Sequence, residues 1–236
     1  MSTETGDSVL VIGGTRFIGR YAVEEFREHG YDVTIFNRGN HENPFAGADD
    51  VTHIEGDRTD DGDLADAAAA DPDVVIDCVA YKPKEVRTAA RLFDDVDAYV
   101  YVSSGAAYGD EDVPKREDET TLCECTDEQA RDDSHETYGP RKAEGDRAVF
   151  AAAERGVNAM SLRPPVVYGP HDYTERFDYW IDRVDGHDRV LVPGDGTNLR
   201  HLVFVEDVAS SLVTLVEHVD AGEAYNVGDE HAPMLG

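Results

Sequence analysis

The sequence predicts an α/β fold with a doubly wound parallel sheet, on two observations. Short apolar runs of strand length alternate with helical stretches through residues 1–163, and this alternation is typical of parallel strands joined by crossover helices. The first apolar run also leads into a glycine-containing turn that opens a helix. Hydrophobic residues make up 40% of the 236 residues, which is enough for the core that such a sheet needs.

We expect six strands and four helices in this alternation. The strands are predicted at residues 8–12, 32–36, 51–55, 73–79, 98–103 and 157–163. The helices are predicted at residues 17–29, 60–70, 83–94 and 135–155. Because crossovers between parallel strands are right-handed, helices of this order cover both faces of the sheet.

The rhythm changes after residue 163, and we place a domain boundary there. Residues 164–236 predict a small C-terminal lobe, interleaved with the last sheet strands and truncated. The expected elements are a loop, a helix through Trp180, a turn at residues 193–196, a helix near 206–218 and a strand near 224–227. The chain stops soon after that strand, so two interpretations stay open: a fragment, or a shorter version of a longer architecture.

The charge of the chain restricts its partners. It carries 51 Asp and Glu against 21 Lys and Arg, a formal net charge of -30, spread along its whole length. Only four lysines occur, and such a composition resembles proteins adapted to high salt. Without a basic stripe to neutralise phosphates, nucleic acid is not an expected partner. No apolar run of 18 residues and no targeting segment is visible, so we expect a cytoplasmic protein without a membrane partner.

The glycine turn at residues 13–19 predicts a dinucleotide-binding site. A turn between the first strand and the first helix can hold a pyrophosphate on backbone N–H groups and on the helix N-terminus. Gly13 would make the tight turn, Gly19 would allow close packing of helix on sheet, and Arg16 replaces the middle glycine of the pattern G-x-x-G-x-x-G. The candidate residues of this turn are Gly13, Thr15, Arg16, Phe17, Ile18 and Gly19.

The ends of the second and third strands add candidates for the adenosine part of the site. Sites selective for NAD usually carry Asp or Glu where this chain has Asn37, and the following Arg38 could pair with a 2′-phosphate. We therefore expect NADP or NAD, with NADP favoured; the alternative is an ordinary turn. Asp57, followed by Arg58, lies where an adenine edge is expected, although an aspartate there is also a common helix cap.

Tyr138 and Lys142 are the candidate catalytic pair. Residues four apart share one face of a helix, so the Lys142 ammonium can lie near the Tyr138 phenol and lower its pKa. Ser104 follows the fifth strand and could hydrogen-bond the substrate oxygen, with Ser103 as its competitor. The alternative for the pair is an exposed couple of side chains on a helix.

The cysteines predict no metal site. Cys78 lies within an apolar run and is expected in the core. Cys123 and Cys125 lie near His135, but structural zinc sites favour C-x₂₋₄-C spacing.

Four motifs together resemble the extended short-chain dehydrogenases/reductases, in particular the NAD-dependent epimerase/dehydratase group. They lie in the family's order at residues 13–19, 103–109, 138–142 and 163–170, and the likeness covers nearly the whole chain. The resemblance implies a Rossmann fold and a bound nicotinamide dinucleotide. It also implies a catalytic set of Ser104, Tyr138 and Lys142.

The same resemblance implies further roles. Asp57 would hold the adenine, Ala80 would lie by the cofactor ribose, and Lys142 would also bind the nicotinamide ribose. Arg16 matches a branch with a GGTRFIG-like turn, and Val166 replaces an Asn that often contacts the substrate diphosphate in sugar-nucleotide epimerases. Cations for a diphosphate would have to come from the last third, with Arg163, Arg176, Arg183, Arg189 and Arg200 as candidates.

The function expected from these features is an NAD(P)-dependent oxidoreductase, epimerase or dehydratase. It would act on a hydroxyl or ketone of a small molecule, a nucleotide sugar above all, and a homodimer is expected. The alternative is a non-catalytic dinucleotide-sensing or RNA-binding protein on the same fold, because the GGTRFIG-like branch also resembles chloroplast stem-loop RNA-binding proteins.

Overall fold

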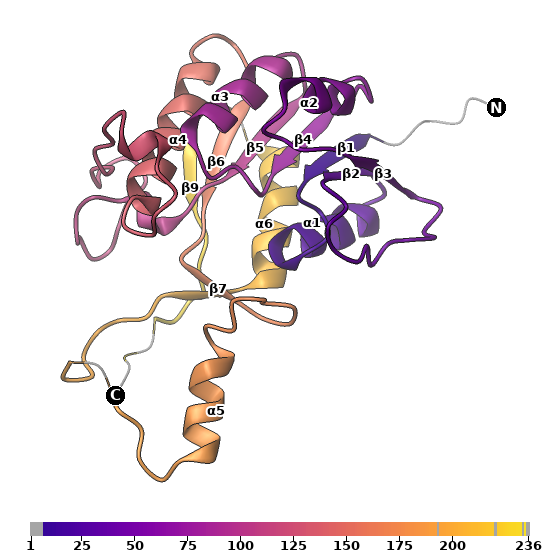
Figure 1. The fold of residues 1–236 in the computed structure, drawn as a ribbon. Helices are drawn as coiled ribbons and strands as arrows, with labels where there is room; N and C mark the ends of the chain where they lie inside the picture. Colours follow the sequence, from indigo (N-terminus) through magenta and orange to yellow (C-terminus); the bar gives the residue numbers. More distant parts are fainter. Residues whose placement is uncertain (1–6, 193, 220, 233, 235–236) are drawn as a thin grey trace.

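The structure is a computed structural model that describes residues 7–192, 194–219, 221–232 and 234. Its main body is a parallel sheet of seven strands in the order β3-β2-β1-β4-β5-β6-β9 (Figure 1). This order confirms the predicted doubly wound sheet, because it runs outward in both directions from β1 and β4. The strands are β1 (Ser8–Ile12), β2 (Asp32–Asn37), β3 (Val51–Glu55), β4 (Val74–Asp77), β5 (Ala98–Val102), β6 (Ala159–Arg163) and β9 (Ala224–Asn226).

Helices cover both faces of this sheet. One layer contains α1 (Phe17–Glu28) and α6 (Val205–His218), which pack against each other. The other contains α2 (Asp61–Ala68), α3 (Pro83–Leu92) and α4 (Tyr138–Ala153). Alternate residues of a strand point to opposite faces, so Val9 joins the core under α1 while Leu10 joins the core under α2 and α3.

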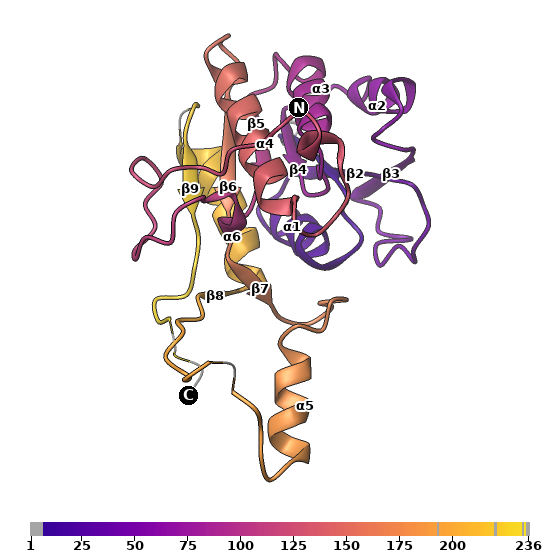
Figure 2. The same ribbon diagram turned by 60° about the vertical axis from the view of Figure 1, so that its left-hand side comes forward.

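The last third of the chain divides between the main body and a protruding part. The helix α6 and the strand β9 return to the sheet, where β9 pairs with β6. The rest projects away from the sheet as β7 (Val166–Tyr168), α5 (Asp178–Gly186) and β8 (Leu202–Phe204), with β7 and β8 paired in parallel (Figures 1 and 2). Sequence analysis missed β7 and β8, because three-residue strands carry too few positions for an alternation to be recognised.

Several predicted elements are shorter in the structure than in the sequence analysis, and two of them lie next to the site. The strand expected over residues 73–79 ends at Asp77, because the chain turns out of the sheet there to form the loop Cys78–Lys82. The helix expected over residues 135–155 begins at Tyr138 and ends before Gly156, which has a φ of 99°.

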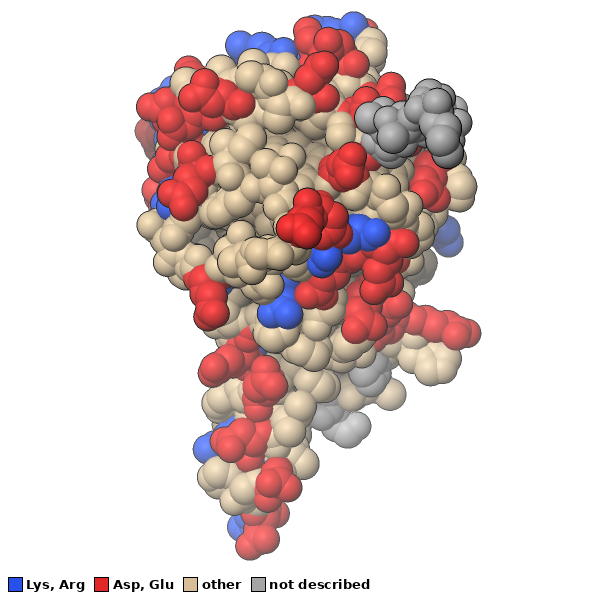
Figure 3. All heavy atoms as spheres, turned by 90° about the vertical axis from the view of Figure 1, so that its right-hand side faces the viewer, with Lys and Arg blue, Asp and Glu red and all other residues tan. Residues whose placement is uncertain are grey.

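Acidic side chains lie almost entirely on the surface. Figure 3 shows a face on which red carboxylates outnumber blue cations and no broad basic patch forms. Among the residues that the structure describes, only three acidic side chains are buried: Asp77, Asp146 and Asp172. No helix in the described part of the chain is long and apolar enough to span a membrane.

The helix α4 lies unusually close to the sheet, which places its first turns over the ends of the strands. A Cβ at Gly145 would lie 2.7 Å from the hydroxyl of Tyr101 on β5, and a Cβ at Gly139 would overlap the carbonyl oxygen of Ala106. Tyr101 is buried and its hydroxyl donates to the carbonyl of Ala80, so the ring is not free to move aside. Glycine at both positions therefore sets the distance between helix and sheet.

We predict that Gly145→Ala destabilises the protein by about 1–3 kcal/mol, because the added methyl group overpacks the contact with Tyr101. The matched control is Gly186→Ala at the end of α5, where an added Cβ meets nothing within 4 Å. The control should be neutral or slightly stabilising, as expected for alanine replacing glycine in a helix. Urea unfolding of both variants measures the change in stability. The same unfolding midpoint for Gly145→Ala as for Gly186→Ala would contradict the prediction.

Candidate active site

A cavity of about 380 Å³ opens at the carboxyl ends of the central strands. Its wall combines the turn between β1 and α1 with the segments that follow β2, β3 and β4. Ligands of doubly wound folds bind at this edge, next to the point where the strand order reverses. The cavity contains every sequence-predicted cofactor residue except Ala80 and Lys142: Gly13, Thr15, Arg16, Phe17, Ile18, Gly19, Asn37, Arg38, Asp57 and Arg58.

The β1–α1 turn has the backbone geometry that a pyrophosphate needs. Gly13 has a φ of 117°, and its N–H donates to the carbonyl of Phe36 at 2.9 Å. A Cβ at Gly19 would lie 3.1 Å from the backbone nitrogen of Gly14, so the helix and the turn lie too close together for a side chain at this position. Within the described residues, the N-cap Arg16 makes no side-chain cap, which leaves the first N–H groups of α1 for an anion. This glycine cradle fits a dinucleotide.

Arg16 and residues that sequence analysis missed form one rim of the cavity. The Arg16 guanidinium lies 3.7 Å from the ring centroid of Tyr173, and its Nη1 lies 3.1 Å from His41 Nε2. Asn37 accepts from the backbone N–H of Gly39 at 2.8 Å and lies 3.2 Å from a ring nitrogen of His53. His41 and Tyr173 lie in loops without periodicity, so no sequence pattern pointed to them.

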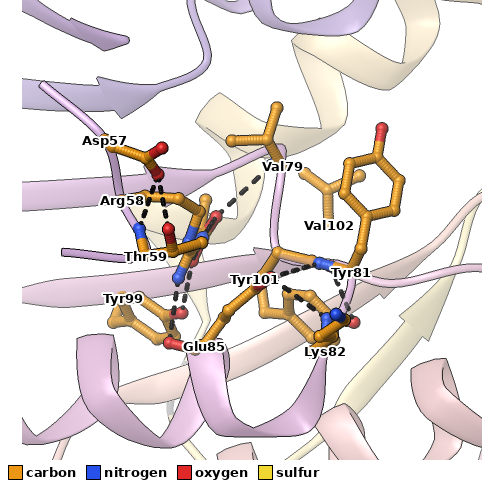
Figure 4. Close-up of polar contacts among 12 residues, drawn as sticks. Asp57, Arg58, Thr59, Val79, Tyr81, Lys82, Glu85, Tyr99, Tyr101 and Val102 are labelled. Carbon is orange, nitrogen blue, oxygen red and sulfur yellow. Dashed lines mark hydrogen bonds and ion pairs between the residues drawn. The ribbon is translucent and has the colours of Figure 1, made fainter. Parts of the chain in front are cut away.

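Asp57 and Arg58 have different surroundings although both line the cavity. Asp57 accepts from the N–H and hydroxyl of Thr59, at 2.9 and 2.8 Å, and these bonds lower the pKa of its carboxyl group. Arg58 is buried, and its Nη1 contacts both carboxylate oxygens of Asp77 at 2.5 and 2.7 Å. Its Nη2 donates to the carbonyl of Glu85 at 2.9 Å (Figure 4). The guanidinium of Arg58 is thus engaged by the protein itself.

The loop Cys78–Lys82 connects this cavity with the candidate catalytic residues. The Glu85 carboxylate accepts from the backbone N–H groups of Tyr81 and Lys82 at 2.8 and 3.0 Å (Figure 4). The carbonyl of Ala80 accepts from Lys142 Nζ at 3.0 Å. Cys78, which was expected in the core, packs against the core and also lines the cavity, because the strand ends one residue before it. Burial raises the pKa of the Cys78 thiol to about 12.

Lys142 lies inside the protein beside Tyr138, and both side chains belong to α4. Its ammonium donates to the carbonyls of Ala80 and Val102, and it lies 5.8 Å from the ring centroid of Tyr138. The same ammonium lies 5.5 Å from the ring centroid of Tyr81, the cavity residue that sequence analysis did not single out. Tyr81 could have been found, because it follows β4 as Ser104 follows β5.

The two serines after β5 point to different places. Ser103 is 3% exposed, and its hydroxyl faces the buried carboxylate of Asp146. Ser104 is more accessible, and its Oγ accepts from the N–H of Ala106 at 3.2 Å. Arg163, a candidate for a substrate diphosphate, is instead buried against Asp146. Among the described side chains, no three His, Cys, Asp or Glu are grouped so that they could hold a metal ion.

The comparison with protein families agrees with this geometry. The model of the NAD dependent epimerase/dehydratase family matches residues 9–96 and 83–228. The chain belongs to this family.

Relatives of this epimerase/dehydratase chain have diverse names. It is 27% identical over 245 residues to a chloroplast stem-loop binding protein of 41 kDa from Arabidopsis thaliana, covering 98% of this chain and 61% of that protein. It is 29% identical over 259 residues to a UDP-glucose 4-epimerase from Corynebacterium glutamicum, covering 93% of this chain and 74% of the relative. The solved structure of MoeE5 in complex with UDP-glucose and NAD matches with a TM-score of 0.74 and 25% identity, covering 97% and 78% of the two chains.

Because Arg58 is already paired inside the protein, we expect it to stabilise the fold and not to bind a ligand. We predict that Arg58→Met destabilises the protein by about 3–5 kcal/mol, because the Asp77 carboxylate stays buried without its partner. The matched control Arg38→Met removes an exposed arginine of the same cavity and should change stability by less than about 0.5 kcal/mol. Urea unfolding measures both. An Arg58→Met variant of wild-type stability that has lost only dinucleotide binding would contradict this prediction.

Proposed function

We propose that this protein is an NAD(P)-dependent epimerase, dehydratase or reductase that acts on a hydroxyl or ketone of a nucleotide sugar. The observation that carries the proposal is the Tyr138–Lys142 arrangement next to the cavity that the glycine turn lines. The buried Lys142 ammonium lies 5.8 Å from the ring centroid of Tyr138. A tyrosine positioned in this way can act as a general acid or base on a substrate oxygen.

Each residue of the catalytic set has a distinct task in this proposal. A bound nicotinamide supplies hydride acceptance and donation. Tyr138 removes the proton from the substrate hydroxyl, or returns it to the carbonyl oxygen, and Ser104 hydrogen-bonds the same oxygen. An ammonium has three N–H donors, and Lys142 uses two for the carbonyls of Ala80 and Val102. The third remains for the cofactor ribose or for Tyr138.

The substrate class rests on the relatives. The UDP-glucose 4-epimerase and the MoeE5 complex with UDP-glucose and NAD both support a nucleoside diphosphate sugar. The buried position of Arg163 removes it from the candidates for binding the diphosphate. The remaining candidates, all on the protruding part or its loops, are Arg176, Arg183, Arg189 and Arg200.

We predict that Tyr138→Phe abolishes hydride transfer while dinucleotide binding survives, because the change removes the exchangeable proton and keeps the ring. Turnover is measured with UDP-glucose and dTDP-glucose in the presence of NAD⁺ and NADP⁺. Binding is measured by the fluorescence of NADH and NADPH. Turnover near the wild-type rate in the variant would overturn the assignment of Tyr138.

The cofactor proposal goes further: the site prefers NADP to NAD. Asn37 carries no charge that would repel a 2′-phosphate, and Arg38 lies on the same wall of the cavity. Arg16 lies at the cavity rim, where its side chain contacts His41. A second guanidinium is therefore available near Arg38. A planar guanidinium can bind a phosphate through two hydrogen bonds.

We predict that Arg16→Ala combined with Arg38→Ala weakens NADP binding roughly ten- to a hundredfold and NAD binding much less. The matched control is Arg27→Ala, because Arg27 lies on α1 and pairs with Asp50 outside the cavity. Titration of the three proteins with both dinucleotides measures the difference. Tighter binding of NAD than of NADP by the wild type would contradict the preference.

A second candidate function is a non-catalytic RNA-binding protein, favoured by the name of the Arabidopsis relative. The net charge of -30 and the acidic surface in Figure 3 oppose it, because RNA phosphates would be repelled. Retention of a stem-loop RNA on immobilised protein distinguishes the two functions. Tight, salt-resistant retention without turnover of any nucleotide sugar would favour the RNA-binding function.

A further inference from the structure

We propose that the buried pair Asp146–Arg163 positions the catalytic set, by fixing the turn that carries Ser104 against the helix that carries Lys142. The two side chains touch neither cavity nor substrate in the mechanism above, so they act as positioning residues. The part of this inference that concerns turnover rests on the proposed function.

The pair is completely enclosed by the main body. Arg163 Nε donates to Asp146 Oδ2 at 2.8 Å, and the side chains are 1% and 0% exposed. Burial raises the pKa of the Asp146 carboxyl, although Arg163 and the hydroxyls of Ser103 and Ser161 act in the opposite direction. A buried ion pair of this kind adds little stability compared with apolar side chains of the same size. What the ion pair supplies is a set of hydrogen bonds with fixed directions, which position the groups that it contacts.

The hydrogen bonds of the pair and of its chain neighbour hold the Ser104 turn at two points. At the end of the turn, Arg163 Nη1 donates to the hydroxyl of Tyr108 at 2.9 Å. Near its beginning, the N–H of Gly105 donates to the carbonyl of Pro164, the residue after Arg163, at 2.8 Å. The turn is therefore attached to the ion pair at its end and to the residue that follows β6 at Gly105.

The same pair holds the catalytic helix. Asp146 lies one turn after Lys142 on α4, so the two side chains share a face of the helix. Lys142 donates to the carbonyl of Val102 at the end of β5, and Asp146 accepts from Arg163 at the end of β6. Two consecutive turns of α4 are thus fastened to the ends of β5 and β6, next to the turn that carries Ser104. A shift of the pair would move Ser104 relative to Lys142 and Tyr138.

Tyr108 allows a test that leaves the ion pair intact. Tyr108→Phe removes one hydroxyl, which accepts from Arg163 and donates to Asn226 at 2.8 Å. The matched control is Tyr225→Phe, which removes the hydroxyl that donates to Glu223, two residues earlier in the chain, at 3.2 Å. Arg163→Met is the stronger variant, but loss of the guanidinium leaves Asp146 buried and can unfold the protein.

The first measurement is amide hydrogen exchange and does not depend on the function of the protein. In Tyr108→Phe we expect exchange in residues 104–109 to rise about tenfold, because the turn opens locally, while residues 8–12 of β1 stay unchanged. Tyr225→Phe should behave as wild type in residues 104–109. Unchanged exchange of this turn in Tyr108→Phe would overturn the inference, whatever the protein catalyses.

The second measurement is steady-state turnover of the nucleotide sugar that the wild type uses, chosen from UDP-glucose and dTDP-glucose. Tyr108→Phe should lower kcat about tenfold and leave KM and NADH affinity unchanged, because misplaced catalytic groups slow the chemical step. Asp146→Asn, which keeps the hydrogen-bond acceptor, should retain more activity than Arg163→Met. Unchanged kcat in a Tyr108→Phe variant with a loosened turn would overturn the positioning role. Absence of turnover in the wild type would contradict the proposed function instead, and hydrogen exchange would still decide whether the pair holds the turn.

Discussion

The ammonium group of Lys142 lies inside the protein, where it must find acceptors that replace water. A buried ammonium without such partners would lose its proton or destabilise the fold by several kcal/mol, on the order of the whole stability margin of a domain. Its acceptors are the carbonyls of Ala80 and Val102, which follow β4 and end β5. Carbonyls at the carboxyl edge of a parallel sheet project beyond the strands, so the ammonium of a helix packed closely over that edge can reach them. The glycines of α4 permit this approach.

The distribution of charge follows the same constraint. The surface is strongly acidic, yet four basic side chains are buried among the described residues, and each has acceptors inside the fold: Arg58, Arg141, Lys142 and Arg163. Three of the four donate to backbone carbonyls: Arg58 to that of Glu85, Arg141 to that of Tyr81 and Lys142 to that of Val102. The few cations that this chain buries are thus used to fix the loops around the cavity. The surplus of carboxylates remains in contact with solvent.

The sequence was sufficient to predict the sheet and the regions of the site, because both depend on local patterns. The apolar runs predicted all seven strands of the sheet: the six of the main alternation and the strand near Ala224 that completes it. The engagement of Arg58 by Asp77 could not be predicted, because the two residues are 19 positions apart and their contact depends on strand order. The same holds for Arg163 and Asp146. An arginine next to a motif looks available for a ligand until its long-range partner is known.

The loop Cys78–Lys82 shows how the two halves of the site are joined. Its backbone is fastened at successive residues: the N–H of Cys78 donates to β1, that of Val79 to Asp77, and that of Tyr81 to Glu85. Its carbonyls accept from Lys142 and from Arg141 of α4. Because this loop is hydrogen-bonded on both sides, it fixes the cavity wall relative to the catalytic helix. Its backbone has little freedom to move. Adjustment to a ligand is left to the side chain of Tyr81, which is 46% exposed at the boundary between the cavity and Lys142.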